Sequence, residues 1–319
     1  MESMSEVLRT LPFAALRKQA EERYRAVLQD PLVQKWRAKY PELTDEDINL
    51  NLNKMYQYVK EYRTCRECPG LDKCPNELEG HATRLMVDEI HGRQQIYDQK
   101  VPCPRYTVWE AEEAVKRRIT SFYVDQGTLT RGYDLKEIVR ADSERAEAVG
   151  YLVDYIDRAK ETGLPTRGLY LQGPLGTGKT FLMCYMLYEL AKQGLSGVIV
   201  YMPDFSEDLK AMFGEPHKLK DTIELMKETD LLVFDDIGAE NMNPWLRDHV
   251  LGTILNYRMN RKPTFFTSNY EFGGLEKHFS FTSKDGEEEF KGQRIMDRIR
   301  HYVDIIEVHG TNKRKLEGE

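Results

Sequence analysis

Apolar positions in the N-terminal fifth of the chain recur at the three- and four-residue spacing of amphipathic helices. The clearest face follows Thr44 and comprises Ile48, Leu52, Met55 and Val59. Thr44 stands before an acidic first turn, where a threonine can cap the helix and the carboxylates suit its macrodipole. This spacing predicts two or three helices between residues 11 and 62.

The pattern then changes to the two-residue period of strands. The segment TRLMVDEIHGRQQIYDQKVPC, residues 83–103, predicts two strands joined by a turn at His91 and Gly92. From Thr107 the spacing is helical again, through TVWEAEEAVKRRITSFYV, and a glycine-containing break follows. We interpret residues 107–142 as a linker.

Short apolar runs alternate with helical segments in the C-terminal half, where a long helix begins near Ser143. The runs are GLYLQ, GVIVYM, LLVFDD and PTFFTSN. Strands alternating with helices predict an α/β domain with a parallel sheet covered on both faces. The polar tail, residues 310–319, is expected to be flexible.

Composition narrows the class of protein. The chain has 319 residues, a length typical of about two domains, and a net charge of −7 that does not indicate nucleic-acid binding by bulk basicity. No run of about 18 apolar residues is present, and the N-terminus lacks the basic start and apolar centre of a signal peptide. We therefore expect a cytoplasmic protein.

The segment after the first predicted parallel strand has the pattern G-x-x-x-x-G-K-[ST]. It comprises Gly173, Pro174, Leu175, Gly176, Thr177, Gly178, Lys179 and Thr180. In such a loop, backbone N–H groups and the following helix N-terminus surround phosphate oxygens. Lys179 can reach the β- and γ-phosphates, and the Thr180 hydroxyl can bind Mg²⁺. The strand before it and the helix after it favour nucleotide binding over a chance glycine-rich turn.

Two carboxylates end the run LLVFDD. Parallel strands deliver their C-terminal residues to the ligand edge of a sheet, so Asp235 can hold Mg²⁺ and Asp236 can polarise an attacking water. Alone, this pair fits equally well a strand that ends at solvent. Together with the phosphate loop, it favours a catalytic site.

Polar and basic groups follow further along. PTFFTSN ends in Asn269, which can orient water between the carboxylates and the γ-phosphate, although Ser-Asn is also common in turns. Arg294 and Arg298 are four residues apart and share a helix face. Arginines can neutralise γ-phosphate charge, but from spacing alone a solvated basic helix is the better interpretation.

The cysteines form a candidate metal site. Residues 65–81 contain C-x2-C-x5-C-x6-H, and the predicted hairpin would return Cys103 beside residue 80. The predicted zinc ligands are Cys65, Cys68, Cys74 and Cys103, with His81 as the alternative ligand. Reduced structural cysteines are the competing explanation. His91 is expected at the surface, and Cys184 in the core.

Residues 143–309 resemble an AAA+ ATPase module, and LLVFDDIGAE, TSN and RIMDRI in this order are typical of the DnaC/DnaI family of bacterial replicative helicase loaders. The resemblance implies an AAA+ P-loop ATPase preceded by a mainly helical, zinc-binding N-terminal domain, residues 1–106. It makes 173–180 the Walker A loop and Asp235 with Asp236 the Walker B pair. Asn269 becomes sensor 1.

The resemblance also gives roles to the arginines and to the domains. Arg298 becomes an arginine finger for an adjacent subunit, and Arg294 a second phosphate-sensing arginine. Asp236 departs from the glutamate usual in AAA+ proteins, which points to slow hydrolysis. The expected cofactors are ATP, Mg²⁺ and Zn²⁺. The expected partners are a hexameric replicative helicase through residues 1–106, single-stranded DNA through the ATPase domain, and further copies of the chain.

Other functions and sites stay open at this level. A transposition helper ATPase has a similar core, and a nucleotide-switched adaptor would use the site without turnover. Tyr201 and Phe205 are candidate aromatic side chains on which DNA bases could stack, although from sequence such residues cannot be told from residues of the hydrophobic core. Leu135 and Ile138 are guesses for the adenine pocket.

Overall fold

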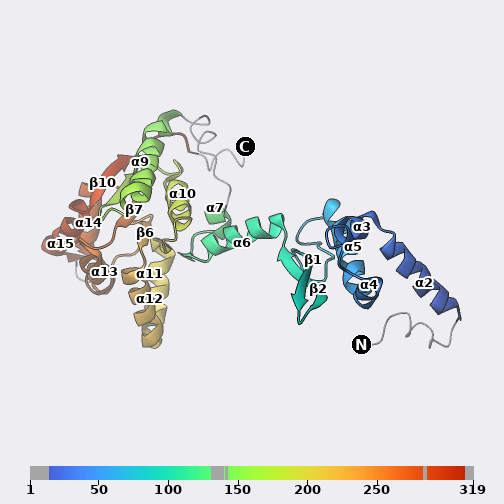
Figure 1. The fold of residues 1–319 in the computed structure, drawn as a ribbon. Helices are drawn as coiled ribbons and strands as arrows, with labels where there is room; N and C mark the ends of the chain where they lie inside the picture. The colour runs from blue at the N-terminus through green and yellow to red at the C-terminus, as the bar shows by residue number, and fades with distance from the viewer. Residues whose placement is uncertain (1–13, 131–139, 141–142, 283–285, 313–319) are drawn as a thin grey trace. The chain divides into compact units, whose positions relative to one another are not determined.

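A computed structural model describes residues 14–130, 140, 143–282 and 286–312. The chain divides into two compact units, residues 1–112 and 113–319 (Figure 1). Each unit is described by itself. Among the described residues, no helix is both long enough and apolar enough to cross a bilayer.

From Ala14 onward, where the structure describes the first unit, four helices come before the hairpin, more than the two or three that were predicted. They are α2 (Ala14–Leu28), α3 (Pro31–Arg37), α4 (Asp45–Leu50) and α5 (Leu52–Arg66). Thr44 caps α4, and Thr44 and Asp47 form a reciprocal capping box. The predicted apolar face is buried, but it is divided between α4 and α5 because the helix is interrupted at Asn51.

The predicted hairpin is confirmed as β1 (His81–Ile90) and β2 (Arg93–Pro102), paired antiparallel. His91 and Gly92 both have positive φ, 53° and 75°, as a two-residue hairpin turn requires. The hairpin packs on α5, and Leu85 and Ile96 join the buried cluster of the helices. Its register sets His81 opposite Pro102, at the open end of the hairpin.

A buried carboxylate joins α5 to both strands of the hairpin. Glu61 is 1% exposed and accepts hydrogen bonds from the amide and hydroxyl of Thr83 at 2.6 and 2.7 Å and from Lys100 Nζ at 2.9 Å. Gln57 donates a further bond at 2.7 Å. Burial by itself raises the pKa of Glu61, but these donors outweigh burial and lower it to about 2.

The predicted connector contains a strand. Helix α6 (Pro104–Lys116) is shorter than the helical pattern, which was expected to run to Val124, and β3 (Ile119–Phe122) follows it. The sequence Ile-Thr-Ser-Phe favours a strand, and the backbone of Ile119 to Phe122 pairs in parallel with β5. The helical prediction was therefore wrong at this point, and part of the expected linker belongs to the sheet. A short helix, α7 (Gln126–Thr130), comes next.

The second unit is built on a six-stranded parallel sheet with the order β10-β4-β7-β6-β5-β3. The four predicted strands are confirmed as β4 (Gly168–Gln172), β5 (Gly197–Tyr201), β6 (Leu231–Asp235) and β7 (Thr264–Ser268). The edge strands β3 and β10 (Val303–Glu307) were not predicted. The α/β class with a parallel sheet is thus confirmed.

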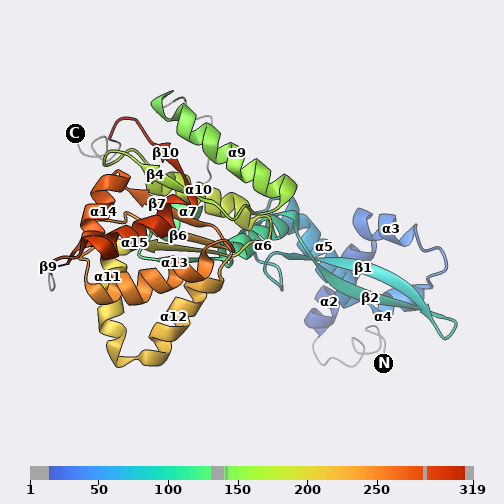
Figure 2. The same cartoon turned by 90° about the vertical axis from the view of Figure 1, so that its left-hand side faces the viewer.

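Helices cover both faces of the sheet (Figure 2). One face carries α7, α9 (Ala146–Thr162) and α10 (Lys179–Ala191), with a 3-10 turn, η1 (Ser143–Arg145), before α9. The other face carries α11 (Met202–Ala211), α12 (Pro216–Glu228), α13 (Gly252–Arg258), α14 (Phe272–Ser280) and α15 (Glu289–Arg300). The remaining elements are η2 (Met212–Gly214), a π-helical turn η3 (Leu246–Leu251), β8 (Phe281–Thr282) and β9 (Gly286–Glu287).

The strands supply two cores because their side chains alternate between the two faces. On β6, Leu232 and Phe234 join one cluster, while Leu231 and Val233 join the other. This two-sided burial explains why β6 reads as a continuous apolar run that ends abruptly at Asp235.

Candidate functional site

The phosphate loop connects β4 to α10, as its pattern predicted. Gly178 has φ of 93°, a left-handed conformation that glycine adopts without strain, and α10 begins at the next residue. A Cβ on Gly173 would lie 2.3 Å from the carbonyl oxygen of Val308, so only glycine fits beside the chain that leaves β10. The loop and the N-terminus of α10 together form the geometry that binds phosphate.

Lys179 lies across the loop and reaches the neighbouring strand. Its ammonium group donates to the carbonyl oxygens of Gly173 and Pro174, at 2.7 and 2.8 Å, and to Oδ1 of Asn269 at 2.8 Å. Lys179 is 7% exposed. The structure therefore brings the predicted lysine and the predicted polar residue after β7 into direct contact.

A second set of contacts surrounds Asp235 at the end of β6. The Thr180 hydroxyl donates to its two carboxylate oxygens at 2.9 and 3.0 Å, and the Thr267 hydroxyl donates to Oδ1 at 2.7 Å. Burial raises the pKa of Asp235 to about 6, although both threonine hydrogen bonds oppose the shift and the nearby charge of Asp236 adds to it. A carboxylate next to a hydroxyl is a suitable pair of oxygen ligands for Mg²⁺.

Asp236 is held by the same strand that supplies Asn269. Its backbone amide donates to Oγ1 of Thr267 at 2.8 Å, and Nδ2 of Asn269 donates to its Oδ1 at 2.9 Å. Asp236 has φ of 54°, which is uncommon for a non-glycine residue and turns the chain sharply after β6. Thr267, which touches both aspartates, was not assigned a role from the sequence. The available signal was a hydroxyl side chain near the carboxyl end of a fully buried strand.

The loop after β6 is fixed by a partly buried pair, Glu240 and His278, that sequence analysis also missed. Glu240 accepts a hydrogen bond from the amide of Gly238 at 2.7 Å and contacts Nε2 of His278 on α14 at 2.9 Å. The Tyr270 ring stacks on His278, with 6.3 Å between ring centroids. These contacts connect the chain after Asp236 to the chain after Asn269.

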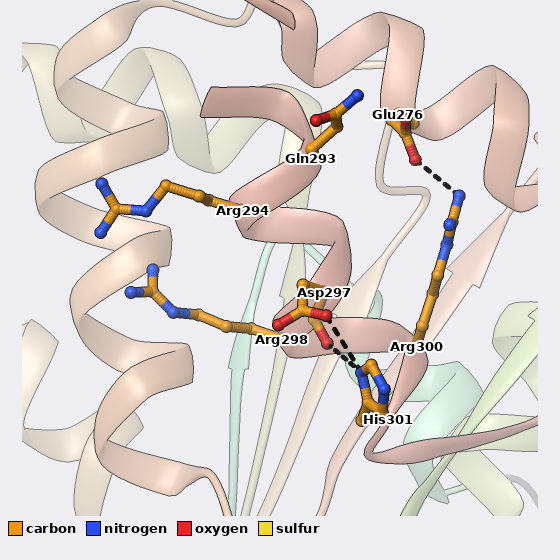
Figure 3. A pocket seen from close by; sticks show the side chains of 7 residues that line it. All are labelled: Glu276, Gln293, Arg294, Asp297, Arg298, Arg300 and His301. Carbon is orange, nitrogen blue, oxygen red and sulfur yellow. Dashed lines mark hydrogen bonds and ion pairs between the residues drawn. The ribbon is translucent and has the colours of Figure 1, made fainter. Parts of the chain in front are cut away.

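The two predicted arginines project from α15 in the same direction, away from Arg300 (Figure 3). Arg300 pairs with Glu276 at 2.6 Å, whereas neither Arg294 nor Arg298 forms a hydrogen bond or ion pair with any residue that the structure describes. The guanidinium of Arg298 lies against Gly252, with Nη1 3.5 Å from the position of a Cβ there. Both arginines line a polar groove of about 510 Å³ between α15 and α13.

The cysteine segment is drawn together by the hairpin. The amide of Cys103 donates to the carbonyl of Gly80 at 2.8 Å, so Cys103 lies beside residue 80 as predicted. The sulfur atoms of Cys65, Cys74 and Cys103 each accept one N–H hydrogen bond at 3.4 Å. Among the described residues, however, no three histidine, cysteine, aspartate or glutamate side chains are close enough together to hold a metal ion.

The other singled-out residues are located as follows. Cys184 is fully buried on α10, which confirms it as a core residue, and burial raises its pKa. Phe205 is 1% exposed and packs in the core, so it is no platform for DNA bases, while Tyr201 is half-buried. His91 is exposed. Leu135 and Ile138 lie outside the residues that the structure describes.

Comparison with known proteins agrees with both units. Residues 1–92 match the family described as primosomal protein DnaI N-terminus, and residues 141–318 match the family of IstB-like ATP binding proteins. The replicative helicase loader DnaI of Bacillus subtilis is 33% identical over 93% of this chain and 94% of its own length. The chain belongs to the DnaI family.

Two further relatives place this result in context. The crystal structure of a DnaI shares 34% identity and a TM-score of 0.50 over 63% of this chain and 99% of that one. An IS21-like putative ATP-binding protein of Bacteroides fragilis is 28% identical, but over only 46% of this chain and 52% of its own length. The likeness to the Bacillus subtilis loader thus extends over 93% of the chain, whereas the likeness to this insertion-sequence protein covers less than half of it.

Proposed function

We propose that this protein is an ATP-dependent AAA+ loader that places the hexameric replicative DNA helicase on single-stranded DNA in the cytoplasm. The observation that carries the proposal is the match to the Bacillus subtilis loader across nearly the full length of both chains. The cluster of the phosphate loop with Asp235, Asp236 and Asn269 supports an ATPase rather than a passive adaptor.

In this proposal, residues 173–180 bind the phosphates and Lys179 moves its charge to the β- and γ-phosphates. Thr180 and Asp235 hold Mg²⁺, which neutralises charge on the phosphate oxygens. Asp236 and Asn269 orient the water that attacks the γ-phosphate in line. The short side chain of Asp236 and its bond to Asn269 favour slow turnover in the isolated protein.

The arginines act on a neighbouring copy of the chain. Arg298, and Arg294 one turn before it, present charge that no described residue neutralises, which suits a site completed by the phosphates of an adjacent subunit. Turnover then requires assembly, and the helicase supplies the surface on which several copies of this protein assemble. The ATPase unit contacts the single-stranded DNA.

The N-terminal unit binds the helicase and holds zinc through Cys65, Cys68, Cys74 and Cys103. The N–H bonds to three of these sulfurs are the kind of contact that stabilises metal-bound thiolates, and His81 is the substitute ligand. The site is structural, because four protein ligands leave no open position. Metal analysis of protein purified without added zinc tests it: one zinc per chain is expected, and its absence from folded protein contradicts it.

Light scattering of the full chain mixed with its cognate helicase, with and without ATP, tests the loader function. A defined complex is expected, followed by ATP-dependent transfer of helicase to circular single-stranded DNA, with Lys179→Ala as the inactive control. If no complex forms under any condition, the proposal fails. The IstB-like match then favours a transposition helper. Complex formation and loading without any ATP turnover would instead identify a nucleotide-switched adaptor.

A further inference from the structure

Two side chains that were not among the predicted site residues, Arg145 and Asn312, lie against the C-terminal half of the phosphate loop. A Cβ on Gly178 would lie 3.3 Å from Nη1 of Arg145, and a Cβ on Gly176 would lie 1.9 Å from Oδ1 of Asn312. Arg145 ends the 3-10 turn before α9 and is 7% exposed, and Asn312 follows β10. Sequence analysis gave neither residue a role.

The chain that carries Asn312 is anchored to the loop. The amide of Val308 donates to the carbonyl of Gln172 at 2.7 Å, Val308 is fully buried, and its carbonyl contacts Gly173. Residues 308–312 therefore run beside the phosphate loop, and the contacts of Val308 hold the start of this segment in place.

The strand order gives the nucleotide a direction. Strand β4, from which the loop leaves, lies between β10 and β7. The contacts of Lys179 with Asn269 and of Thr180 with Asp235 lie on the β7 side of β4. A nucleotide whose reacting phosphate lies there would extend from the loop toward the other side, where Arg145 approaches Gly178 and Asn312 approaches Gly176.

From this arrangement we infer that Arg145 and Asn312 bind the nucleoside end of the nucleotide, with the guanidinium on the face of the purine base and the carboxamide on its polar edge. A guanidinium is planar and stacks on aromatic rings. A carboxamide offers one donor and one acceptor side by side, which matches the N6 and N7 edge of adenine and not the two acceptors of guanine. The inference rests on the proposed ATP site and adds its base specificity.

Titration calorimetry with ATP, GTP and tripolyphosphate tests this inference in the full-length protein. Asn312→Ala and Arg145→Gln are each expected to weaken ATP binding at least fivefold while tripolyphosphate affinity stays within twofold of wild type. Asn312→Ala is also expected to reduce the preference for ATP over GTP. The matched controls are His309→Ala, on the same segment, and Arg158→Gln, the same charge change at an exposed position of α9; both should bind ATP like wild type.

The three ligands separate the possible outcomes. If affinity for tripolyphosphate falls in parallel with that for ATP, the two residues only support the loop, and the inference is wrong. Unchanged ATP affinity overturns it as well. If Arg145→Gln does not fold, Asn312→Ala decides alone. Failure of the ATP site itself has a different signature, because wild type and Lys179→Ala would then bind all three ligands equally weakly.

Discussion

Two buried carboxylates, one in each unit, have opposite electrostatic surroundings. Glu61 in the first unit and Asp235 in the second are 1% and 2% exposed. Burial pushes both pKa values upward, yet the pKa of Glu61 falls to about 2 and that of Asp235 rises to about 6. The difference lies in what surrounds them.

Glu61 has a full set of partners that includes a charge. Lys100 pairs with it at 2.9 Å, and the amide of Thr83 donates at 2.6 Å, so the negative charge is neutralised inside the fold. Asp235 receives hydrogen bonds from two hydroxyls and lies near the negative charge of Asp236. A carboxylate satisfied by the protein stabilises structure, whereas one that is left short of positive charge is suited to hold a cation.

Asparagine at position 235 should give the largest effect. Asp235→Asn keeps the size of the side chain and its bonds to the threonines but removes the charge that would hold Mg²⁺. Turnover measured with helicase and single-stranded DNA is expected to fall by a factor on the order of 10³, with the melting temperature of the protein unchanged or higher. A variant that keeps wild-type turnover would show that this carboxylate is not a metal ligand.

Alanine at position 61 should lower the stability of the first unit and leave the nucleotide site unaffected, the opposite of what is expected for Asp235→Asn. Glu61→Ala leaves the amide and hydroxyl of Thr83 without their acceptor and removes the buried partner of Lys100, which keeps only its contacts with the exposed Glu77 and the Thr83 hydroxyl oxygen. The free energy of unfolding of the first unit is expected to fall by about 3 kcal/mol, as measured by urea denaturation, with ATP affinity unchanged. Glu79→Ala, an exposed carboxylate nearby, is the matched control and should be neutral within about 0.5 kcal/mol.

The same contrast between satisfied and unsatisfied charge separates two arginines of α15. If Arg298 acts on a neighbouring copy as proposed, Arg298→Ala is expected to reduce turnover in the assembled complex by about 30-fold with ATP affinity unchanged. Arg300→Ala breaks an exposed pair with Glu276 and should alter turnover less than twofold. Mixing Arg298→Ala with Lys179→Ala protein should restore part of the activity, since each supplies what the other lacks. Absence of any restoration would argue against action between subunits.

Sequence patterns predicted those parts of the molecule that local chemistry determines. The phosphate loop, four buried strands and the turn at His91 each depend on a short run of residues whose physics is local. Strands β3 and β10 were missed because they lie at the edges of the sheet and are only partly buried, so neither forms a continuous apolar run.

The contacts of the site could be predicted only in part, for a related reason. Asn269 was expected beside the carboxylates that end β6 because parallel strands align their carboxyl ends, and it contacts Asp236. Thr267, Glu240 and Arg145 take part through distances between segments far apart in the chain, and no periodicity encodes those distances. The metal ligands depend on the same kind of long-range closure, and for them the sequence pattern remains a prediction.

The smallest effect should appear in the response to pH, where the two carboxylates differ in sign. The folded pKa of Glu61 is depressed, so its stabilisation is complete above about pH 4.5 and is lost as the pH falls toward 2. The folded pKa of Asp235 is raised above its usual 3.8, so ionisation costs stability in the nucleotide-free protein, and that cost disappears as the pH falls below about 6.

The proton that binds Asp235 in this pH range also competes with Mg²⁺. Between pH 7.5 and 5.5 the affinity for Mg²⁺-ATP should therefore fall severalfold, while binding of ATP in EDTA changes less. Calorimetry at the two pH values measures both, and Asp235→Asn should abolish the difference. If the variant keeps the wild-type pH dependence, another group is titrating, and the contrast between the two carboxylates does not extend to function.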